Sequence, residues 1–294
     1  MLILKNLFRD IMGKILRKEK KTEKEKKIIL IGIINLTDDS FYDGGKYLSV
    51  ESAIEHAIQL IEDGADILDF GAESSRPGAV SISAEQELER LLPVVKAMKQ
   101  YIADNHLPVL ISVDTYKTVV AEECLKLGAN IINDITGLSD SAMTKVIAKY
   151  NATVIIMHMQ GTSQTMQHEP KYENVIAEIK RFLAERAMFA KKAGIKQQNI
   201  ILDPGIGFGK TVEHNLEIIR NLDAFISLDY PILLGTSRKS FIGRITGADV
   251  QERLPGTIAM NTIALLKGIS YLRVHDIKEH KQVVQLLEEY SKSE

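Results

Sequence analysis

The stretches Ile28-Ile-Leu-Ile-Gly-Ile-Ile34 and Asp66-Ile-Leu-Asp-Phe70 are apolar runs that enclose a polar loop and a helix-like segment at 50–63. Within that segment apolar residues recur every three or four positions, as on one face of a helix, and Gly64 ends it. The first run is continuous and does not alternate with polar residues, which is typical of a parallel strand buried on both faces. The region therefore predicts a strand, a helix and a second, parallel strand.

The same rhythm of strand-like run and helix-like segment continues to the end of the chain. Eight such pairs predict an α/β fold, a single (β/α)8 TIM barrel at 28–294, preceded by a basic extension at 1–27. A doubly wound open sheet is the competing architecture. We favour the barrel because polar residues follow nearly every strand, whereas an open sheet concentrates its ligand groups at one switch point. Strands are predicted near 28–34, 66–70, 108–113, 130–133, 153–157, 199–203, 231–235 and 270–274, and helices near 50–63, 84–103, 117–127, 141–149, 173–193, 213–221, 255–267 and 277–291.

Composition excludes several classes of protein. The 294 residues carry a net charge of −2, so nothing global indicates nucleic-acid binding. No apolar run reaches the length of about 18 residues that a membrane span needs. The single Cys124 excludes an intrachain disulfide and indicates a reducing, cytoplasmic compartment.

The extension at 1–27 differs from the rest of the chain. It holds 10 Lys and Arg residues and 4 Asp and Glu residues, a net charge of +6. Its apolar residues recur at helical spacing, so a basic amphipathic helix on an anionic membrane is one interpretation. We favour the simpler one, a frayed or barrel-packed extension followed by a solvated run of charges.

Polar side chains recur where the predicted strands end. A polar group stranded in a core costs a few kcal/mol, whereas one at the mouth of a buried strand can meet a ligand. Because such residues follow strand after strand, they predict one active-site surface at the strand ends. Three of them together resemble a hydrogen-bonding template for a heterocycle edge, although one Asp alone could instead cap a helix. The residues are Asn35, Asp114, Asn133, Asp203, Lys239 and Arg273, and the template is Asp114, Asn133 and Asp203.

Two long loops add further candidates. The loop from Asn35 to Gly45 contains three aspartates, which indicates either a divalent cation with its phosphate ligand or an acidic surface turn. Arg76 in the second loop suits a phosphate or a carboxylate, or else pairs with Glu73 on the surface. Near the last two strands, the anion-seeking residues are Lys239, Arg273 and His275.

The remaining motifs do not match a nucleotide-binding loop, a nucleophilic triad or a zinc site. The run from Gly205 to Thr211 lacks the first glycine that a Walker A loop needs, because Pro204 stands there. His158 is interpreted as structural, and Cys124 as buried packing within a helix. No Ser-His-Asp order, Cys-x-x-Cys or His-Glu-x-x-His motif is present. The site therefore looks built to orient ligands and stabilise charge rather than to supply a nucleophile.

The motifs taken together resemble those of the dihydropteroate synthases, the pterin-binding enzymes of folate synthesis. The resemblance covers residues 28–281 and keeps the family's motif order. Its motifs are Asn35-Leu-Thr-Asp-Asp-Ser-Phe, Glu73-Ser-Ser-Arg-Pro-Gly, Ser112-Val-Asp-Thr, Ile132-Asn-Asp, Met157-His-Met-Gln-Gly-Thr, Asp203-Pro-Gly-Ile-Gly-Phe-Gly-Lys, Ser237-Arg-Lys-Ser and Arg273-Val-His-Asp.

The resemblance implies a transferase that joins 6-hydroxymethyl-7,8-dihydropterin pyrophosphate to 4-aminobenzoate with Mg²⁺, releasing 7,8-dihydropteroate and pyrophosphate. It also implies a homodimer. Asp114, Asp203, Lys239 and Arg273 would be the catalytic residues. The implied ligand sets are Asp114, Asn133, Asp203 and Lys239 for the pterin; Asn35, Arg76, Arg273 and His275 for pyrophosphate; Ser75, Pro77, Phe208, Lys239 and Ser240 for aminobenzoate; and Asn35 for the metal.

The chain departs from the family pattern at a few positions. Asp38 stands where the family usually has Pro, Ala72 where Gly is common, and Ser75 where Thr is common. A corrinoid-linked methyltransferase of the same superfamily is an alternative, but it needs no pyrophosphate corner. A non-catalytic pterin-binding paralogue is another, for which Asp38 is the one indication.

Overall fold

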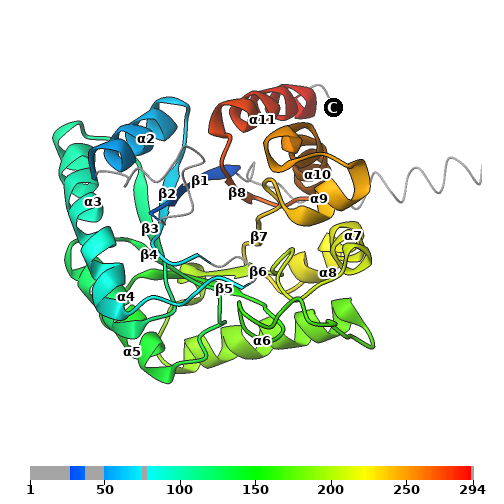
Figure 1. Cartoon of the computed structure of the whole chain (residues 1–294), viewed down its shortest axis with the longest axis horizontal. Helices are drawn as coiled ribbons and strands as arrows, with labels where there is room; N and C mark the ends of the chain where they lie inside the picture. Colours follow the sequence, from blue (N-terminus) through cyan, green and yellow to red (C-terminus); the bar gives the residue numbers. More distant parts are fainter. Residues whose placement is uncertain (1–26, 37–49, 75–77, 293–294) are drawn as a thin grey trace, which may run out of the picture.

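The computed structural model of the chain describes residues 27–36, 50–74 and 78–292. Eight strands in this part of the chain form one parallel sheet that curls into a barrel, with the helices outside it (Figure 1). The strands are β1 (Ile29–Asn35), β2 (Ile67–Gly71), β3 (Leu110–Asp114), β4 (Ile131–Asp134), β5 (Thr153–Met157), β6 (Ile200–Asp203), β7 (Leu233–Leu234) and β8 (Tyr271–Val274).

The sheet closes on itself. Its strands follow the order β6, β5, β4, β3, β2, β1, β8, β7, and a parallel bridge between Leu202 and Ile232 joins the two ends. The amide of Leu202 also donates to the carbonyl of Pro231 at 2.9 Å. The predicted (β/α)8 barrel is therefore confirmed, and the open sheet is wrong.

The predicted helices all form, and each matches its observed bounds to within two residues. The short helices α8 and α9 were not predicted, because five and seven residues are too few for helical periodicity to appear. The helices are α2 (Val50–Glu62), α3 (Ala84–Asp104), α4 (Thr118–Lys126), α5 (Ser141–Lys149), α6 (Val175–Lys192), α7 (Val212–Arg220), α8 (Leu222–Ile226), α9 (Ser240–Thr246), α10 (Leu254–Leu266) and α11 (Ile277–Ser291).

Strand β7 is shorter than the predicted strand at 231–235. Only Leu233 and Leu234 pair regularly with β8, and Ile232 makes a single bridge. Pro231 has no N–H to donate to a neighbouring strand, so regular pairing does not extend to the start of the predicted strand. The weakest seam of the barrel therefore lies between β6 and β7.

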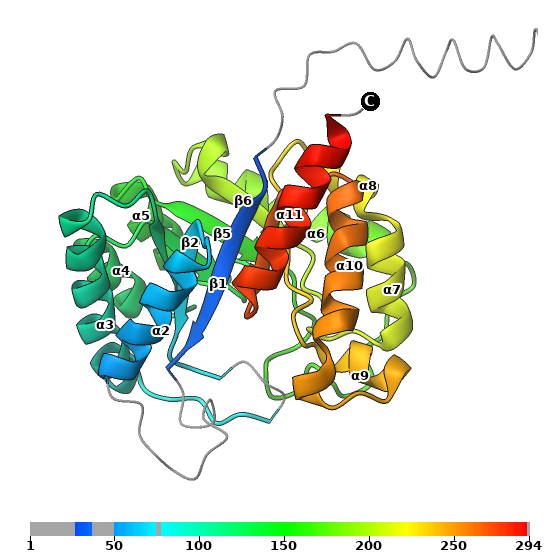
Figure 2. The same ribbon diagram turned by 90° about the horizontal axis from the view of Figure 1, so that it is seen from above.

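The apolar core has two parts. The larger part lies between the sheet and the surrounding helices, and Figure 2 shows α2 and α11 flanking β1 in this way. The smaller part fills the barrel interior beneath the strand ends. Its members are Ile31, Ile67, Ile131, Ile155, Ile201 and Leu233.

The predicted extension at 1–27 lies outside the described residues except for Lys27, whose ammonium contacts Asp66 at 2.7 Å. Among the helices that the structure describes, none is long and apolar enough to cross a membrane.

Candidate active site

The strand register places the predicted polar residues at one end of the barrel. Side chains two residues apart on a strand point to the same face, so Asn133 follows Ile131 into the barrel interior, and Asp203 follows Ile201. Asp114 pairs in register with Asn133 on one side and with Gly71 on the other. These residues lie directly above the apolar cluster that fills the barrel interior, at the end of the barrel where the strands end.

A charged cluster lies at the centre of this surface. The Arg273 guanidinium donates from Nε to Asp69 Oδ2 at 2.6 Å and from Nη2 to Asp114 Oδ2 at 2.8 Å. Asn133 Nδ2 donates to the same Asp69 oxygen at 3.1 Å. One arginine of β8 is thus bound to carboxylates from β2 and β3, and the amide of β4 joins them.

Asp69 is a residue that the sequence reasoning missed. It lies fully buried in the middle of β2, between Leu68 and Phe70, rather than at the strand end. The available signal was a carboxylate inside an apolar run, which requires a buried partner. Its Oδ1 and the hydroxyl of Ser112, its register neighbour on β3, have no hydrogen-bond partner among the described residues. Both polar atoms therefore suit a water molecule or a ligand edge deep in the barrel.

Burial sets the ionisation of Asp114. It raises the pKa of that carboxyl to about 7, while Arg273 acts in the opposite direction and Asp69 adds to the rise. Burial also raises the pKa of Asp203, whose Oδ1 accepts from the amide of Gly205 at 2.7 Å. The pKa of Arg273 is raised, because Asp69 and Asp114 outweigh a burial effect that alone would lower it.

Helix capping does not explain Asp114. Helix α4 has Lys117 as its N-cap residue, without a side-chain cap, and Thr115 Oγ1 accepts from the Lys117 amide at 3.1 Å. Asp114 bonds Arg273 instead. The alternative that a strand-end aspartate serves only as a helix cap is therefore wrong for Asp114.

Lys239 lies at the end of the loop that follows β7, and its side chain reaches the loop that follows β6. Its ammonium donates to the carbonyl of Ile206 and lies 4.0 Å from the centre of the Phe208 ring. Burial lowers the pKa of Lys239 to about 7, although Asp203 opposes this. Ser240 is the first residue of α9 and is exposed. Lys239, Phe208 and Ser240 thus stand near the mouth, whereas Ser75, Arg76 and Pro77 lie outside the described residues.

The loop between β6 and α7 turns on three glycines. Gly205, Gly207 and Gly209 have φ values of 70°, 81° and 63°, which favour glycine. Lys210, 2% exposed, points into the protein and donates to His158 Nδ1 at 3.1 Å and to the Phe208 carbonyl at 2.9 Å. Burial lowers the pKa of His158 to about 3. The loop therefore buries its lysine, unlike a phosphate-binding loop, and His158 serves as a structural partner, as predicted.

Asn35 and His275 lie at the ends of adjacent strands. Asn35 is the last residue of β1 and is half-buried. His275 follows β8, and its Nδ1 lies 2.9 Å from the hydroxyl of Ser237. The aspartates predicted beside Asn35 lie outside the described residues. The predicted Cys124 is fully buried within α4, as packing requires.

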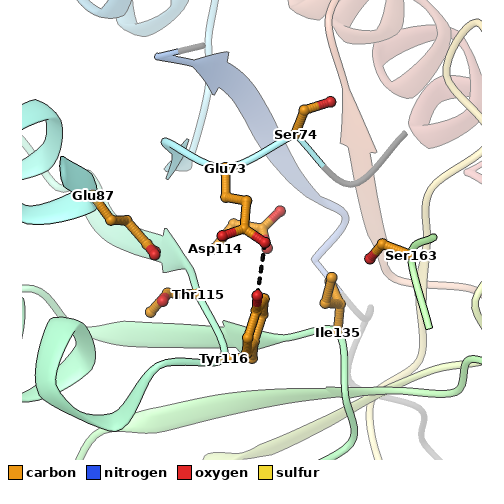
Figure 3. Close-up of a pocket in the computed structure, with 8 residues that line it drawn as sticks. All are labelled: Glu73, Ser74, Glu87, Asp114, Thr115, Tyr116, Ile135 and Ser163. Atoms are coloured by element: carbon orange, nitrogen blue, oxygen red, sulfur yellow. Dashed lines mark hydrogen bonds between the residues drawn. The ribbon is translucent and has the colours of Figure 1, made fainter. Parts of the chain in front are cut away.

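An acidic pocket adjoins Asp114. Figure 3 shows Glu73, Asp114 and Tyr116 gathered at its centre, and the Tyr116 hydroxyl donates to Glu73 Oε1 at 2.7 Å. Lys117 donates to Glu73 and, at 2.5 Å, to Glu87. Glu73 is thus engaged by two side chains that follow β3, which anchors the start of the loop after β2.

Comparisons with known proteins show the family to which this chain belongs. The family model described as "Pterin binding enzyme" matches residues 31–275. A dihydropteroate synthase of Clostridium beijerinckii is 46% identical over 259 residues, which is 87% of this chain and 92% of that protein.

Two solved structures have the same fold. The dihydropteroate synthase of Clostridium difficile, determined in the presence of pteroic acid, has a TM-score of 0.81 and 42% identity, covering 89% of this chain and 95% of that one. That of Thermus thermophilus, in complex with 4-aminobenzoate, has a TM-score of 0.79 and 41% identity, covering 89% and 94%. The chain therefore belongs to the dihydropteroate synthase family of pterin-binding enzymes.

Proposed function

We propose that this chain condenses 6-hydroxymethyl-7,8-dihydropterin pyrophosphate with 4-aminobenzoate, forming 7,8-dihydropteroate and pyrophosphate for folate biosynthesis. The observation that carries the proposal is the cluster of Asp69, Asp114 and Arg273 at the barrel mouth, with Asn133 and Asp203 beside it. The relatives support the substrate class, since pteroic acid and 4-aminobenzoate accompany two of them.

Four residues, Asp114, Asn133, Asp203 and Lys239, form the proposed pterin site. The carboxylates of Asp114 and Asp203 accept hydrogen bonds from the N–H groups of the pterin edge. Asn133 donates one amide hydrogen to Asp69, and its Oδ1 is a further acceptor for the pterin edge. The site is therefore rich in acceptors, as a heterocycle that presents N–H donors requires. Lys239, the fourth member, supplies a donor for the ring carbonyl or a ring nitrogen.

The proposed bond cleavage separates charge. When the bond between the pterin methylene carbon and the pyrophosphate oxygen breaks, the electron pair leaves with that oxygen. Positive charge develops on the methylene and the pterin ring, where Asp114 and Asp203 stabilise it. Negative charge grows on pyrophosphate, where Arg273 and His275, with Arg76 from the loop after β2, stabilise it.

The amine then completes the exchange. The nitrogen lone pair of 4-aminobenzoate forms the new carbon–nitrogen bond, and one of its protons passes to solvent or to pyrophosphate. An arylamine is a sufficient nucleophile for a cationic methylene, so no strong base is needed. We assign the aminobenzoate site to Phe208 and Ser240, with Ser75 and Pro77 from the loop after β2. The charge of Lys239 over the Phe208 ring suits the carboxylate of this substrate.

Mg²⁺ is the proposed metal, with Asn35 as its protein ligand. Within the described residues, no group of three or more His, Cys, Asp or Glu side chains is arranged to hold a metal ion. One amide oxygen nevertheless fits Mg²⁺, which keeps several waters and is commonly held by substrate phosphates with one or two protein oxygens. Bound there, the ion would neutralise charge on the pyrophosphate.

We further propose a cytoplasmic homodimer. Helix α10 is apolar around most of its circumference, and Ala259, Ile263 and Leu266 lie exposed on successive turns. Ile245 of the neighbouring α9 is also exposed. A second copy would cover this face. The cytoplasmic assignment rests on the single cysteine, Cys124, because the chain has no disulfide of its own to form.

The test is a coupled assay of the purified full-length chain with Mg²⁺, the dihydropterin pyrophosphate and 4-aminobenzoate. We expect pyrophosphate release that depends on both substrates and matches dihydropteroate formation. Asp114→Ala and Arg273→Ala should each lower kcat/KM by roughly 10²–10³, as for the loss of one electrostatic contact. Near-normal values in both variants would overturn the site, and pterin binding without release by the unaltered chain would identify a binding protein instead.

A further inference from the structure

The loop after β7 contains a residue in an unusual backbone conformation. Arg238 has a φ of 54°, in the left-handed region that non-glycine residues rarely adopt. Its chain neighbours are Ser237, which contacts His275, and Lys239, which reaches Phe208. Conformations of this kind persist only where the surrounding structure enforces them, and they cluster at functional sites.

An extensive set of hydrogen bonds enforces this conformation. The guanidinium of Arg238 donates from Nε and Nη2 to both oxygens of Asp276, at 3.0 and 2.5 Å, and from Nη1 to Gln251 at 2.8 Å. Its backbone amide donates to Thr257 Oγ1 at 3.0 Å. Its carbonyl accepts from Arg253 at 3.2 Å. Backbone and side chain of this one residue are therefore both held.

The pair connects two loops of the proposed site. Asp276 directly follows His275 after β8, and Arg238 directly follows Ser237 after β7. A second link runs beside the first, because the His275 amide donates to Ser237 Oγ at 3.2 Å and His275 Nδ1 lies 2.9 Å from the same hydroxyl. The loops that follow β7 and β8 are thus joined by two successive residues of each loop. Ser237 contacts His275, and Arg238 pairs with Asp276.

We infer that the bidentate ion pair between Arg238 and Asp276 is a positioning device. It holds Lys239, on the loop after β7, in position relative to Arg273 of β8 and His275 on the loop that follows β8. The inference rests on the proposed function, because those three residues are its pterin and pyrophosphate groups. The guanidinium of Arg238 is already committed to Asp276 and Gln251, so the pair acts through its neighbours rather than on substrate.

The geometry of the pair matters more than its charge. The side chains of Arg238 and Asp276 are 22% and 13% exposed, so the pair is partly shielded from water. Two parallel hydrogen bonds from the planar guanidinium to the carboxylate fix the relative orientation of the two side chains as well as the distance between them. A lysine ammonium fixes only the distance. We therefore expect Arg238→Lys to fail nearly as fully as Arg238→Gln. A misplacement of about 1 Å can lower a rate by roughly 10²-fold, so kcat/KM for the dihydropterin pyrophosphate should fall by roughly 10–100-fold.

The experiment is a double-mutant cycle on the full-length enzyme. Arg238→Gln, Asp276→Asn and the double variant are compared for kcat, for KM of each substrate and for thermal unfolding. If the pair acts as one unit, the double variant should be about as impaired as either single variant rather than showing the product of both losses. Lys149→Gln, which removes the more exposed Lys149–Glu122 pair, is the matched control and should leave the kinetics unchanged.

Two results would overturn the inference. One is a folded Arg238→Lys and a folded Asp276→Asn that both keep kcat/KM within twofold of the unaltered chain. The other is a loss of activity that only follows the unfolded fraction, with normal kcat and KM at temperatures where each variant is folded. If the unaltered chain itself shows no turnover, the proposed function fails, which is a result distinct from either of these.

Discussion

Asp114 is subject to opposing influences at the residue scale. Burial disfavours its charge, while Arg273, bound at 2.8 Å, favours it, and the pKa is raised to about 7. The ionised carboxylate accepts pterin N–H groups and stabilises the developing cation. The protonated acid does neither well, so the proposed chemistry predicts a dependence on pH near neutrality.

We expect the binding of 6-hydroxymethyl-7,8-dihydropterin to strengthen as the pH rises through about 7, because Asp114 is protonated below its raised pKa and ionised above it. The dissociation constant should fall roughly tenfold between about pH 6 and 8. Fluorescence titration of this pyrophosphate-free ligand avoids the ionisation of the phosphates.

Two variants assign the titration. Asp114→Asn should show a flat profile in that range. Lys239→Met removes an ammonium whose pKa is also about 7 and should retain the strengthening. A profile that persists in Asp114→Asn would assign the titration to another group.

Asp69 is predicted to stabilise both the fold and the site. Asp69→Asn keeps the shape but removes a charge that holds Arg273 and Asn133. Unfolding should become easier by about 1–3 kcal/mol, the usual effect of impairing a buried hydrogen bond to a charged group. Urea denaturation measures this, and kcat/KM should fall because Arg273 is no longer held toward Asp114. Ser112→Ala at the register neighbour is the control, and equal losses in both variants would contradict a specific role for Asp69.

At the scale of elements, the loop between β6 and α7 joins the loop after β5 to the proposed aminobenzoate site. Lys210 binds His158 and the Phe208 carbonyl, and Asn215 Oδ1 accepts from the Gly207 amide at 2.7 Å. A Cβ at Gly205 would lie 1.9 Å from the His158 carbonyl oxygen, so only glycine fits there. This close contact explains the glycine at position 205, and the burial of Lys210 distinguishes the loop from a phosphate-binding loop.

Lys210→Met is predicted to loosen this loop. Methionine fills a similar volume but leaves the Phe208 carbonyl without its buried donor, which costs about 1–3 kcal/mol. The KM for 4-aminobenzoate should rise more than the KM for the pterin substrate, because Phe208 belongs to the former site. Steady-state kinetics with each substrate varied in turn measures the difference. Equal changes in both constants would argue against a local effect.

At the scale of the whole molecule, the exposed apolar face of α10 predicts self-association. Size-exclusion chromatography with light scattering should give the protein a molar mass twice the 32.8 kDa of one chain. A double variant, Ile263→Glu with Leu266→Glu, should shift it to the monomer, because two charges would be buried in the contact. Met188→Glu on α6, also at an exposed apolar position, is the control. A monomeric unaltered chain would refute the proposed homodimer.

The barrel was predictable because its signals are local. Runs such as Ile200-Ile-Leu202 show burial on both faces, and Gly64, Gly128 and Gly194 end helices with φ values near 100°. Helices α8 and α9 were not predictable, because they are too short for helical periodicity to appear. The shortness of β7 was not predictable either, because it depends on how the barrel closes between β6 and β7. Of the site, the strand-end residues were found from position alone, whereas Asp69 inside β2 was missed.

The sequence by itself determined the order of strands and helices, the barrel and the polar residues at its mouth, because hydrophobic periodicity and strand ends are properties of neighbouring residues. The tertiary structure alone decided which polar groups meet. Arg273 bonds Asp69 and Asp114, 204 and 159 positions away in the chain, and Arg238 pairs with Asp276 across two loops. The partners of Arg273 are set by strand register around a closed sheet, and the Arg238–Asp276 pair is set by the approach of the loops after β7 and β8. The raised pKa of Asp114 and the lowered pKa of Lys239 come from burial in the folded barrel, which no local sequence pattern specifies.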